Sequence, residues 1–229
     1  MRALPPRATW RGRLVSPYSM RMRDRRLTDA AKTQLVEAVK TVESVSSVEV
    51  VVCVRKRSAA YAEAPLGSAL VVSMLMLAYE LYAPQPFALH WMLINPLMLA
   101  ALTWGLVVSL PPLQRALTRA SRRRTAALAS ARAAFFELGV RRTRDRIGVL
   151  LFFSQLEREL VVLVDDGVRD AIPEGVLEDL IKALETPYRA DQGLLAAARA
   201  LAVAGETFAT HLPVAEDDVN ELGDEVRHG

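Results

Sequence analysis

The sequence contains few of the groups that build a catalytic or metal centre. It has one cysteine, Cys53, and three histidines, of which two, His211 and His228, are isolated near the end of the chain. A single cysteine excludes an intramolecular disulfide and a cysteine-based metal cluster, and its place in an apolar run favours a buried position. The chain also lacks a P-loop, GxSxG, HExxH and a cysteine-based phosphate loop. The common self-sufficient catalytic constellations are therefore excluded.

Basic residues are missing from one long segment. Residues 58–114 contain no lysine or arginine, and two apolar stretches, 66–82 and 87–113, are separated there by a proline-containing turn. A membrane span needs about 20 apolar residues, and both stretches are of that order. The segment predicts a two-helix transmembrane hairpin over 58–115. The alternative is a buried helical hairpin of a soluble protein, although such a hairpin normally shows a polar face.

Basic clusters border the apolar segment on both sides. Residues 55–57 precede it, and five arginines follow it: Arg115, Arg119, Arg122, Arg123 and Arg124. The positive-inside rule predicts a multi-pass protein of the inner or plasma membrane with both flanks, and hence the globular part, in the cytoplasm. The five arginines are either ligands for anionic lipid headgroups or only a topology anchor.

The distribution of charge also indicates which partners to expect. A net charge of +3 would permit nucleic-acid binding, but the positive charge gathers beside the apolar segment, where membrane orientation explains it better. We therefore predict membrane lipid and other membrane proteins as partners, and no nucleic acid.

The two ends of the chain differ from its middle. Residues 1–26 are rich in arginine, contain a single acid and lack the apolar core of a secretory signal. They predict a disordered basic extension, with a transit peptide or a true start at Met20 or Met22 as alternatives. Residues 216–229 form an acidic tail that we expect to be loosely held.

Three apolar runs predict strands, at 48–54, 148–153 and 160–164. The short polar gap between the last two makes an antiparallel hairpin the natural connection. Neither of these two runs alternates with polar residues, which indicates a sheet covered on both faces.

Helical patterns surround these strands. Helices are expected from Thr28 or Asp29, over 115–139 with a stop at Gly139, over 174–186, and over 191–210. Without the hairpin, the order is helix, strand, helix, two strands, helix, helix. This order predicts the α/β class: a three-layer single domain with a small mixed sheet flanked by helices, built discontinuously from 27–57 and 116–215.

Acidic residues mark the end of the last strand. Asp165 and Asp166 directly follow the apolar run 160–164, and the ends of strands are where open α/β sheets usually place a site. With Glu49 and Asp145 they form a candidate set of oxygen ligands for calcium or another divalent cation, provided that they converge in space. The alternatives are a solvated acidic turn and, for Asp145, ion pairing with the arginines around it.

Several segments in a fixed order carry a family resemblance: 48–52, 137–145, 148–158, 165–168, 193–195, 212–213 and 218–222. They cover most of the chain outside residues 1–26 and the insertion. Together they resemble the TPM domain family, named after thylakoid-lumen, photosystem-repair and acetylcholine-receptor-associated members. Many relatives have a proline where this chain has Gly223. This chain resembles a membrane-inserted member of bacterial type.

The resemblance implies a three-layer α/β fold and, in some relatives, an acidic pocket that holds a divalent cation such as calcium. It also implies a weak acid phosphatase activity, as proposed for plant relatives. A phosphatase needs a nucleophile or a metal-activated water, together with positive charge for the phosphate. Two function classes therefore stay open: a membrane-anchored interaction or assembly module, and a metal-dependent acid phosphatase.

Overall fold

The computed structural model describes residues 17–190, 192–214 and 227–228, and it gives the backbone alone for 17–29 and 227–228. Residues 1–16 of the expected basic extension and 215–226 of the acidic tail lie outside this description. Helix α1 spans Pro17–Val45 and thus begins before the expected start at Thr28. The structure thus continues the helix back to Pro17, whereas the disorder expected for residues 1–26 stays a prediction. Extending an existing helix costs little free energy when the added residues are good helix formers such as arginine and methionine.

The sheet has the strand order β3-β2-β1-β4 and is mixed. Strands β1 (Glu49–Arg55) and β2 (Gly148–Ser154) are parallel, whereas β2 and β3 (Glu159–Val164) form the predicted antiparallel hairpin. The two-residue strand β4 (Arg227–His228) lies parallel to β1 on its other side. The expected strands and their hairpin connection are confirmed.

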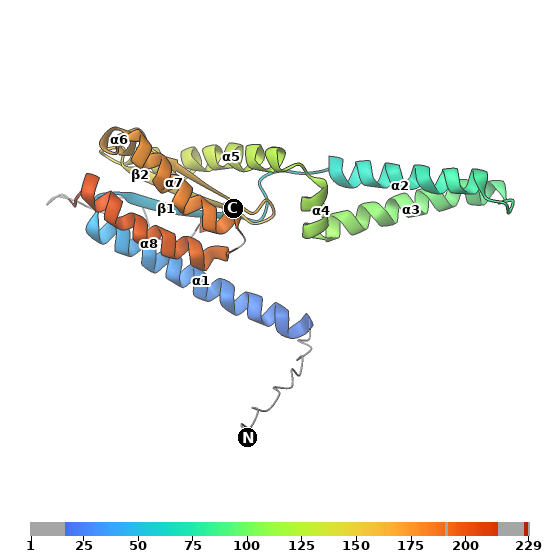
Figure 1. The fold of residues 1–229 in the computed structure, drawn as a ribbon, viewed down its shortest axis with the longest axis horizontal. Helices are drawn as coiled ribbons and strands as arrows, with labels where there is room; N and C mark the ends of the chain where they lie inside the picture. The colour runs from blue at the N-terminus through green and yellow to red at the C-terminus, as the bar shows by residue number, and fades with distance from the viewer. Residues whose placement is uncertain (1–16, 191, 215–226, 229) are drawn as a thin grey trace, which may run out of the picture.

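Helices cover both faces of the sheet, which confirms the three-layer α/β class. Helices α1, α7 (Glu174–Arg189) and α8 (Gly193–His211) lie on one face, and α5 (Ala120–Glu137) lies on the other (Figure 1). Alternate residues of each strand point to opposite faces. On β1, Val50 and Val52 therefore join the core beneath α1, while Val51 and Cys53 pack beneath α5. Cys53 is buried, as expected.

The insertion is a long helical hairpin that projects from the domain (Figure 1). Helices α2 (Glu63–Tyr82) and α3 (Leu89–Ser109) are each long and apolar enough to cross a membrane. Only 17% of the apolar stretch of α2 and 11% of that of α3 are buried within the protein. A core hairpin would bury most of its apolar side chains, so α2 and α3 are not a buried core hairpin of this domain.

Two helix boundaries differ from expectation. The helix expected over 115–139 is two helices, α4 (Pro111–Leu117) and α5, because Thr118 is extended and its buried hydroxyl donates to the carbonyl of Gln114 at 2.8 Å. Helix α7 runs through Pro187 to Arg189, although proline normally ends a helix. Arg189 forms ion pairs with Glu159 and Glu185, and these contacts stabilise the last turn. The stop at Gly139 is confirmed, since this glycine has φ 72° directly after α5.

Three short elements had no counterpart in the sequence analysis. They are the 3-10 helix η1 (Val140–Arg142), helix α6 (Asp166–Ala171) and strand β4. Helix α6 lies at the end of the domain opposite α4 and the hairpin (Figure 1). The end of β3 that carries Asp165 therefore faces away from the insertion.

Candidate functional site at the hairpin junction

A buried polar network joins the linker that follows β1 to the turn between β2 and β3. Its centre is the carboxylate of Glu157, which is 2% exposed. The backbone N–H of Ser58 donates to Glu157 Oε1 at 2.9 Å, and the hydroxyl of Tyr61 donates to the same oxygen at 2.7 Å. The hydroxyl of Ser154 donates to Oε2 and lies 2.6 Å from that of Ser58. One carboxylate thus accepts three hydrogen bonds from both sides of the junction.

Tyr61 is buried within the junction and is affected by both its burial and its contact with Glu157. Burial of the ring, followed by the hydrogen bond to Glu157 and the negative charge of that residue, raises the pKa of Tyr61 well above its ordinary range. Backbone pairing extends the contact, because the N–H of Gln155 donates to the carbonyl of Arg55 at 3.0 Å. The linker into the hairpin is therefore an ordered part of the domain.

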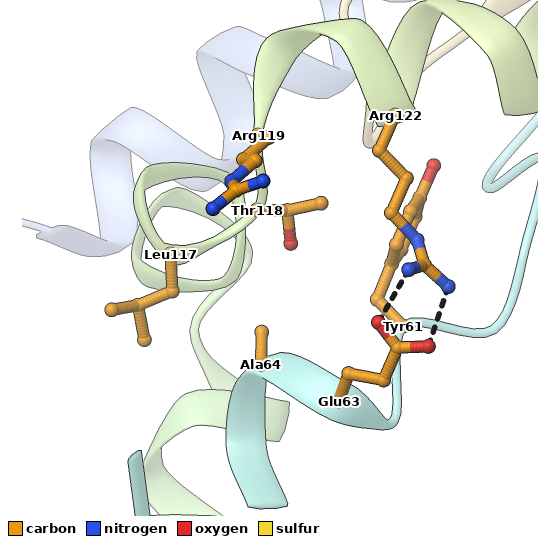
Figure 2. Close-up of a pocket in the computed structure, with 7 residues that line it drawn as sticks. All are labelled: Tyr61, Glu63, Ala64, Leu117, Thr118, Arg119 and Arg122. Carbon is orange, nitrogen blue, oxygen red and sulfur yellow. Dashed lines mark hydrogen bonds and ion pairs between the residues drawn. The ribbon is translucent and has the colours of Figure 1, made fainter. Parts of the chain in front are cut away.

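The two ends of the insertion lie next to each other. Arg122 of α5 forms a forked ion pair with Glu63, the first residue of α2, and one branch is 2.7 Å long. Beside this pair is a cavity of about 250 Å³, lined by Tyr61, Glu63, Ala64, Leu117, Thr118, Arg119 and Arg122 (Figure 2). Leu117 and Ala64 give it apolar walls, and Arg119 and Arg122 give it positive charge.

A second cavity, of about 300 Å³, adjoins the β2–β3 turn. Its lining residues are Arg115, Arg123, Glu157, Arg158, Glu159 and Arg189. The ion pair between Arg189 Nε and Glu159 is 2.7 Å long. Glu185 also contacts Arg189, and burial raises the pKa of Glu185 although the positive charge of Arg189 opposes this shift. The cavity thus contains both charge signs, with arginines in excess.

The five arginines expected to meet lipid headgroups separate into three positions. Arg119 and Arg122 line the first cavity, and Arg115 and Arg123 line the second. Arg124 is exposed, and its positive charge acts on Glu185. Four of the five thus line one or the other of these two cavities, and a lipid-headgroup role for them stays a prediction.

The four expected metal ligands are not brought together. Asp166 is exposed and pairs with Arg146 at 2.9 Å, and Asp145 is exposed in the turn before β2. Glu49 lies opposite Gly148 on β2, whose carbonyl accepts from the N–H of Asp165, so β2 separates Glu49 from Asp165. The carboxylates of Glu49 and Asp165 therefore do not meet across adjacent strands, because β1 and β3 are not neighbours.

Asp165 has a structural role that the sequence analysis missed. It is the N-cap of α6, and its Oδ1 accepts from the N–H of Asp166 at 2.9 Å. Arg141 Nε lies 3.9 Å from the same oxygen. The other oxygen, Oδ2, is buried and has no hydrogen-bond partner among the described residues. Asp165 is thus one potential ligand without companions.

The donor set does not fit a calcium site. Calcium takes six to eight oxygen ligands. Within the described residues, no group of three or more His, Cys, Asp or Glu side chains is placed to hold a metal ion. The corner around Asp165 is also filled by backbone, since a Cβ on Gly167 would lie 2.3 Å from the carbonyl oxygen of Asp145. We therefore derive no chemistry through a metal here.

Sequence reasoning missed the residues that make the junction. Ser58 and Tyr61 fall within the insertion expected over 58–115, Ser154 and Glu157 fall in the polar gap between two expected strands, and Arg158 and Arg189 have no expected role. The spacing of Ser154 and Glu157 was a usable signal, because it places two polar side chains in one tight turn directly after an apolar strand. The partner linker could not be identified, because its contact depends on the parallel pairing of β1 and β2.

Comparisons with known proteins agree with the fold. No protein-family model and no curated protein matches the chain. Among solved structures, the chain is similar to the NMR structure of the BA42 protein from the psychrophilic bacterium Bizionia argentinensis. The likeness has 14% identity and a TM-score of 0.52, and it covers 87% of this chain and 93% of that one. It shows the fold alone.

Proposed function

We propose that this protein is a membrane-anchored α/β domain that acts as an interaction or assembly module for other membrane proteins. The observation that carries the proposal is the ordered junction, where Glu157 joins the linker before α2 to the β2–β3 turn. A flexible linker would let the domain change its orientation and its distance from the bilayer. A closed network instead holds one end of the sheet beside the base of the hairpin, which suits presentation of the domain to neighbouring membrane proteins.

The proposed topology places both flanks of the hairpin in the cytoplasm, in an inner or plasma membrane. Residues 55–57 and the arginines at the start of α5 support it, since basic residues stay on the cytoplasmic side. The turn between α2 and α3 then reaches the other side. The first cavity faces the bilayer surface in this arrangement, and Arg119 and Arg122 are proposed to meet anionic headgroups there.

The resemblance to the TPM family is part of the proposal. The three-layer order of the domain supports it, as does the strand hairpin whose sequence resembles that family. Metal-dependent phosphatase activity is the competing function. It receives no support from the position of Asp145, which is exposed, or from those of Asp165 and Asp166, which form the cap of α6 and an ion pair with Arg146.

Site-specific photo-crosslinking in native membranes tests the assembly role. A photoreactive residue would replace Met74 or Leu97 in the hairpin and, separately, Phe136 or Val203 on the domain, all of which are exposed. We expect at least one position to give a discrete adduct with another integral membrane protein or with a second copy of the chain. Adducts with lipid alone from all four positions would reduce the protein to a tethered domain and overturn the assembly role.

Hydrolysis of a generic phosphomonoester by the detergent-purified protein separates the two function classes. We expect the same background rate for the wild type and for the double variant Asp165→Ala, Asp166→Ala. Divalent-cation-dependent turnover that the double variant abolishes would establish the enzyme instead.

A further inference from the structure

The first cavity, beside the start of α2, lies at the depth where a phospholipid carries its phosphate. Helix α2 has 20 residues, which correspond to roughly 30 Å of helix and thus to the whole hydrocarbon thickness of a bilayer. In the proposed membrane anchoring, on which this inference rests, its first residue, Glu63, is therefore at the bilayer surface. Glu63 lines the first cavity, which places this cavity at the level of the headgroups.

One of the two arginines of the first cavity is already occupied. Arg122 forms a forked ion pair with Glu63, so its positive charge is balanced within the protein. This pairing matters at a membrane surface, because the phosphates of an anionic bilayer would repel an unpaired carboxylate. Two arginines against one glutamate leave a single positive charge among the lining residues.

That remaining charge belongs to Arg119. Within the described residues, no hydrogen bond or ion pair involves the guanidinium group of Arg119. Figure 2 shows this group on the side of the cavity away from the Glu63–Arg122 ion pair. The planar fork of a guanidinium matches the oxygens of a phosphate in two-point contacts. Arg119 is therefore placed to bind a phosphate without disturbing the neighbouring ion pair.

The apolar walls of the first cavity suit the uncharged part of a lipid. Leu117 and Ala64 form these walls, and Leu117 is exposed. Beyond Ala64, Leu66 and Leu70 are 65% and 62% exposed and continue the apolar surface along α2. A phosphate bound to Arg119 would thus have an apolar helix surface beside it for the attached acyl chains. This continuity favours a lipid over a soluble phosphate.

We propose that the first cavity binds the headgroup of a phospholipid with one net negative charge, such as phosphatidylglycerol, and that Arg119 is its ligand. One phosphodiester monoanion neutralises the one positive charge in excess. Glu63 sets this charge preference, because it withholds Arg122, and a second free arginine would favour a dianionic headgroup. A volume of about 250 Å³ equals that of roughly eight waters in the liquid, which leaves room for the phosphodiester.

Photo-crosslinking from within the cavity tests the proposal. The full chain, with a photoreactive residue in place of Leu117, would be placed in nanodiscs of one part phosphatidylglycerol to four parts phosphatidylcholine. Mass spectrometry would then count the adducts with each lipid. We expect phosphatidylglycerol at about fivefold above its share of the bilayer, which is the enrichment that one arginine near the surface provides. The same photoreactive residue at the exposed Leu97, in the middle of α3, should report the bulk proportions.

Three variants of the Leu117-labelled chain separate the roles of the charges. Arg119→Gln should remove the enrichment, whereas Arg132→Gln, an exposed arginine of α5 outside the cavity, should keep it. Glu63→Gln frees the fork of Arg122. In nanodiscs with equal parts of phosphatidylglycerol and phosphatidic acid, Glu63→Gln should therefore shift the adducts toward phosphatidic acid, and an unchanged ratio would overturn the role of Glu63.

Failure of the headgroup site and failure of the proposed function give different results. Bulk lipid proportions at Leu117, no lipid adduct there, or equal enrichment in the wild type and Arg119→Gln would overturn the site, while lipid adducts at Leu97 still support the membrane anchoring. Absence of lipid adducts at Leu97 would contradict the anchoring itself. Excess dimethyl phosphate at constant ionic strength should leave the enrichment unchanged. Its loss would show that the cavity takes a soluble phosphodiester and would overturn the lipid.

Discussion

The substitution Glu157→Ala should loosen the connection between the hairpin and the domain. The carboxylate accepts from Ser58 N–H at 2.9 Å, from the Tyr61 hydroxyl at 2.7 Å and from the Ser154 hydroxyl. The side chains of Tyr61 and Ser154 are 5% and 0% exposed, so water cannot readily replace the lost acceptor. A buried donor that loses its partner costs about 1–3 kcal/mol.

The stability that the junction loses in Glu157→Ala is smaller than three such penalties, because removal of the carboxylate also removes the cost of burying a charge. We estimate a loss of about 3 kcal/mol, on the order of a hundredfold in the local opening equilibrium. Glu157→Gln keeps Oε1 as an acceptor and nearly the same shape, so it should cost roughly 1 kcal/mol. Both variants lose the negative charge, but only Glu157→Ala loses every acceptor. The difference in stability between them therefore measures the contribution of the hydrogen bonds.

Hydrogen exchange of residues 57–62 in the detergent-purified full chain measures this opening. We expect exchange to accelerate strongly in Glu157→Ala and weakly in Glu157→Gln, while residues in β2 keep their wild-type protection. Glu206→Ala, a change of the same kind at an exposed position on α8, is the control and should leave residues 57–62 unchanged. If Glu157→Ala exchanges like the wild type over this segment, the network does not hold the junction and the reasoning is wrong.

Replacing residues 58–114 by a short flexible linker should leave a soluble, folded domain, and a molten or insoluble product in circular dichroism and gel filtration would contradict this. Gly167→Ala should lower the melting temperature strongly, because its Cβ would lie 2.3 Å from a backbone oxygen of Asp145; a wild-type melt would contradict the close approach. Tyr61 has a raised pKa, so the stability that it contributes is complete below its ordinary value of about 10 and is lost as the pH rises above that value. The stability of Tyr61→Phe should accordingly fall less in that range. Millimolar calcium should not shift the melting temperature of the wild type, and a shift absent from Asp165→Asn would restore the metal site.

Sequence patterns predicted the helices and strands that are determined by residues close to one another in the chain. The strands 148–153 and 160–164 are apolar runs on either side of a polar turn, and the structure pairs them as expected. The length of the two apolar stretches likewise predicted the helical insertion, because a long apolar stretch can only be buried in protein or placed in lipid. Gly139 ends α5 because its positive φ suits glycine, which is also a local effect.

The acidic strand end shows where local reasoning failed. Acids after a strand indicate a site when they converge with acids from neighbouring strands, and convergence depends on strand order. Here β2 lies between Glu49 and Asp165, and Asp165 begins a helix too short to be recognised from the sequence. An aspartate at a helix N-cap and an aspartate in a metal pocket have the same sequence pattern, and only the three-dimensional arrangement separates them.

The place of the insertion follows from the topology of the sheet. Parallel strands such as β1 and β2 cannot be joined by a tight turn and need a crossover of a dozen or more residues. In this chain α5 provides the crossover and packs on the sheet through Ala127 and Ala131, so the domain is complete without any residue of the hairpin. The chain already has to leave the sheet at the end of β1, and a segment added there interrupts no strand. Arg55, the last residue of β1, donates to Ser130 at 3.1 Å and pairs with Glu137 at 2.9 Å, which fixes α5 independently of the linker that follows. The crossover can therefore accept the α2–α3 hairpin without loss of core contacts, and the contacts of Glu157 then decide how firmly the hairpin and the domain are held together.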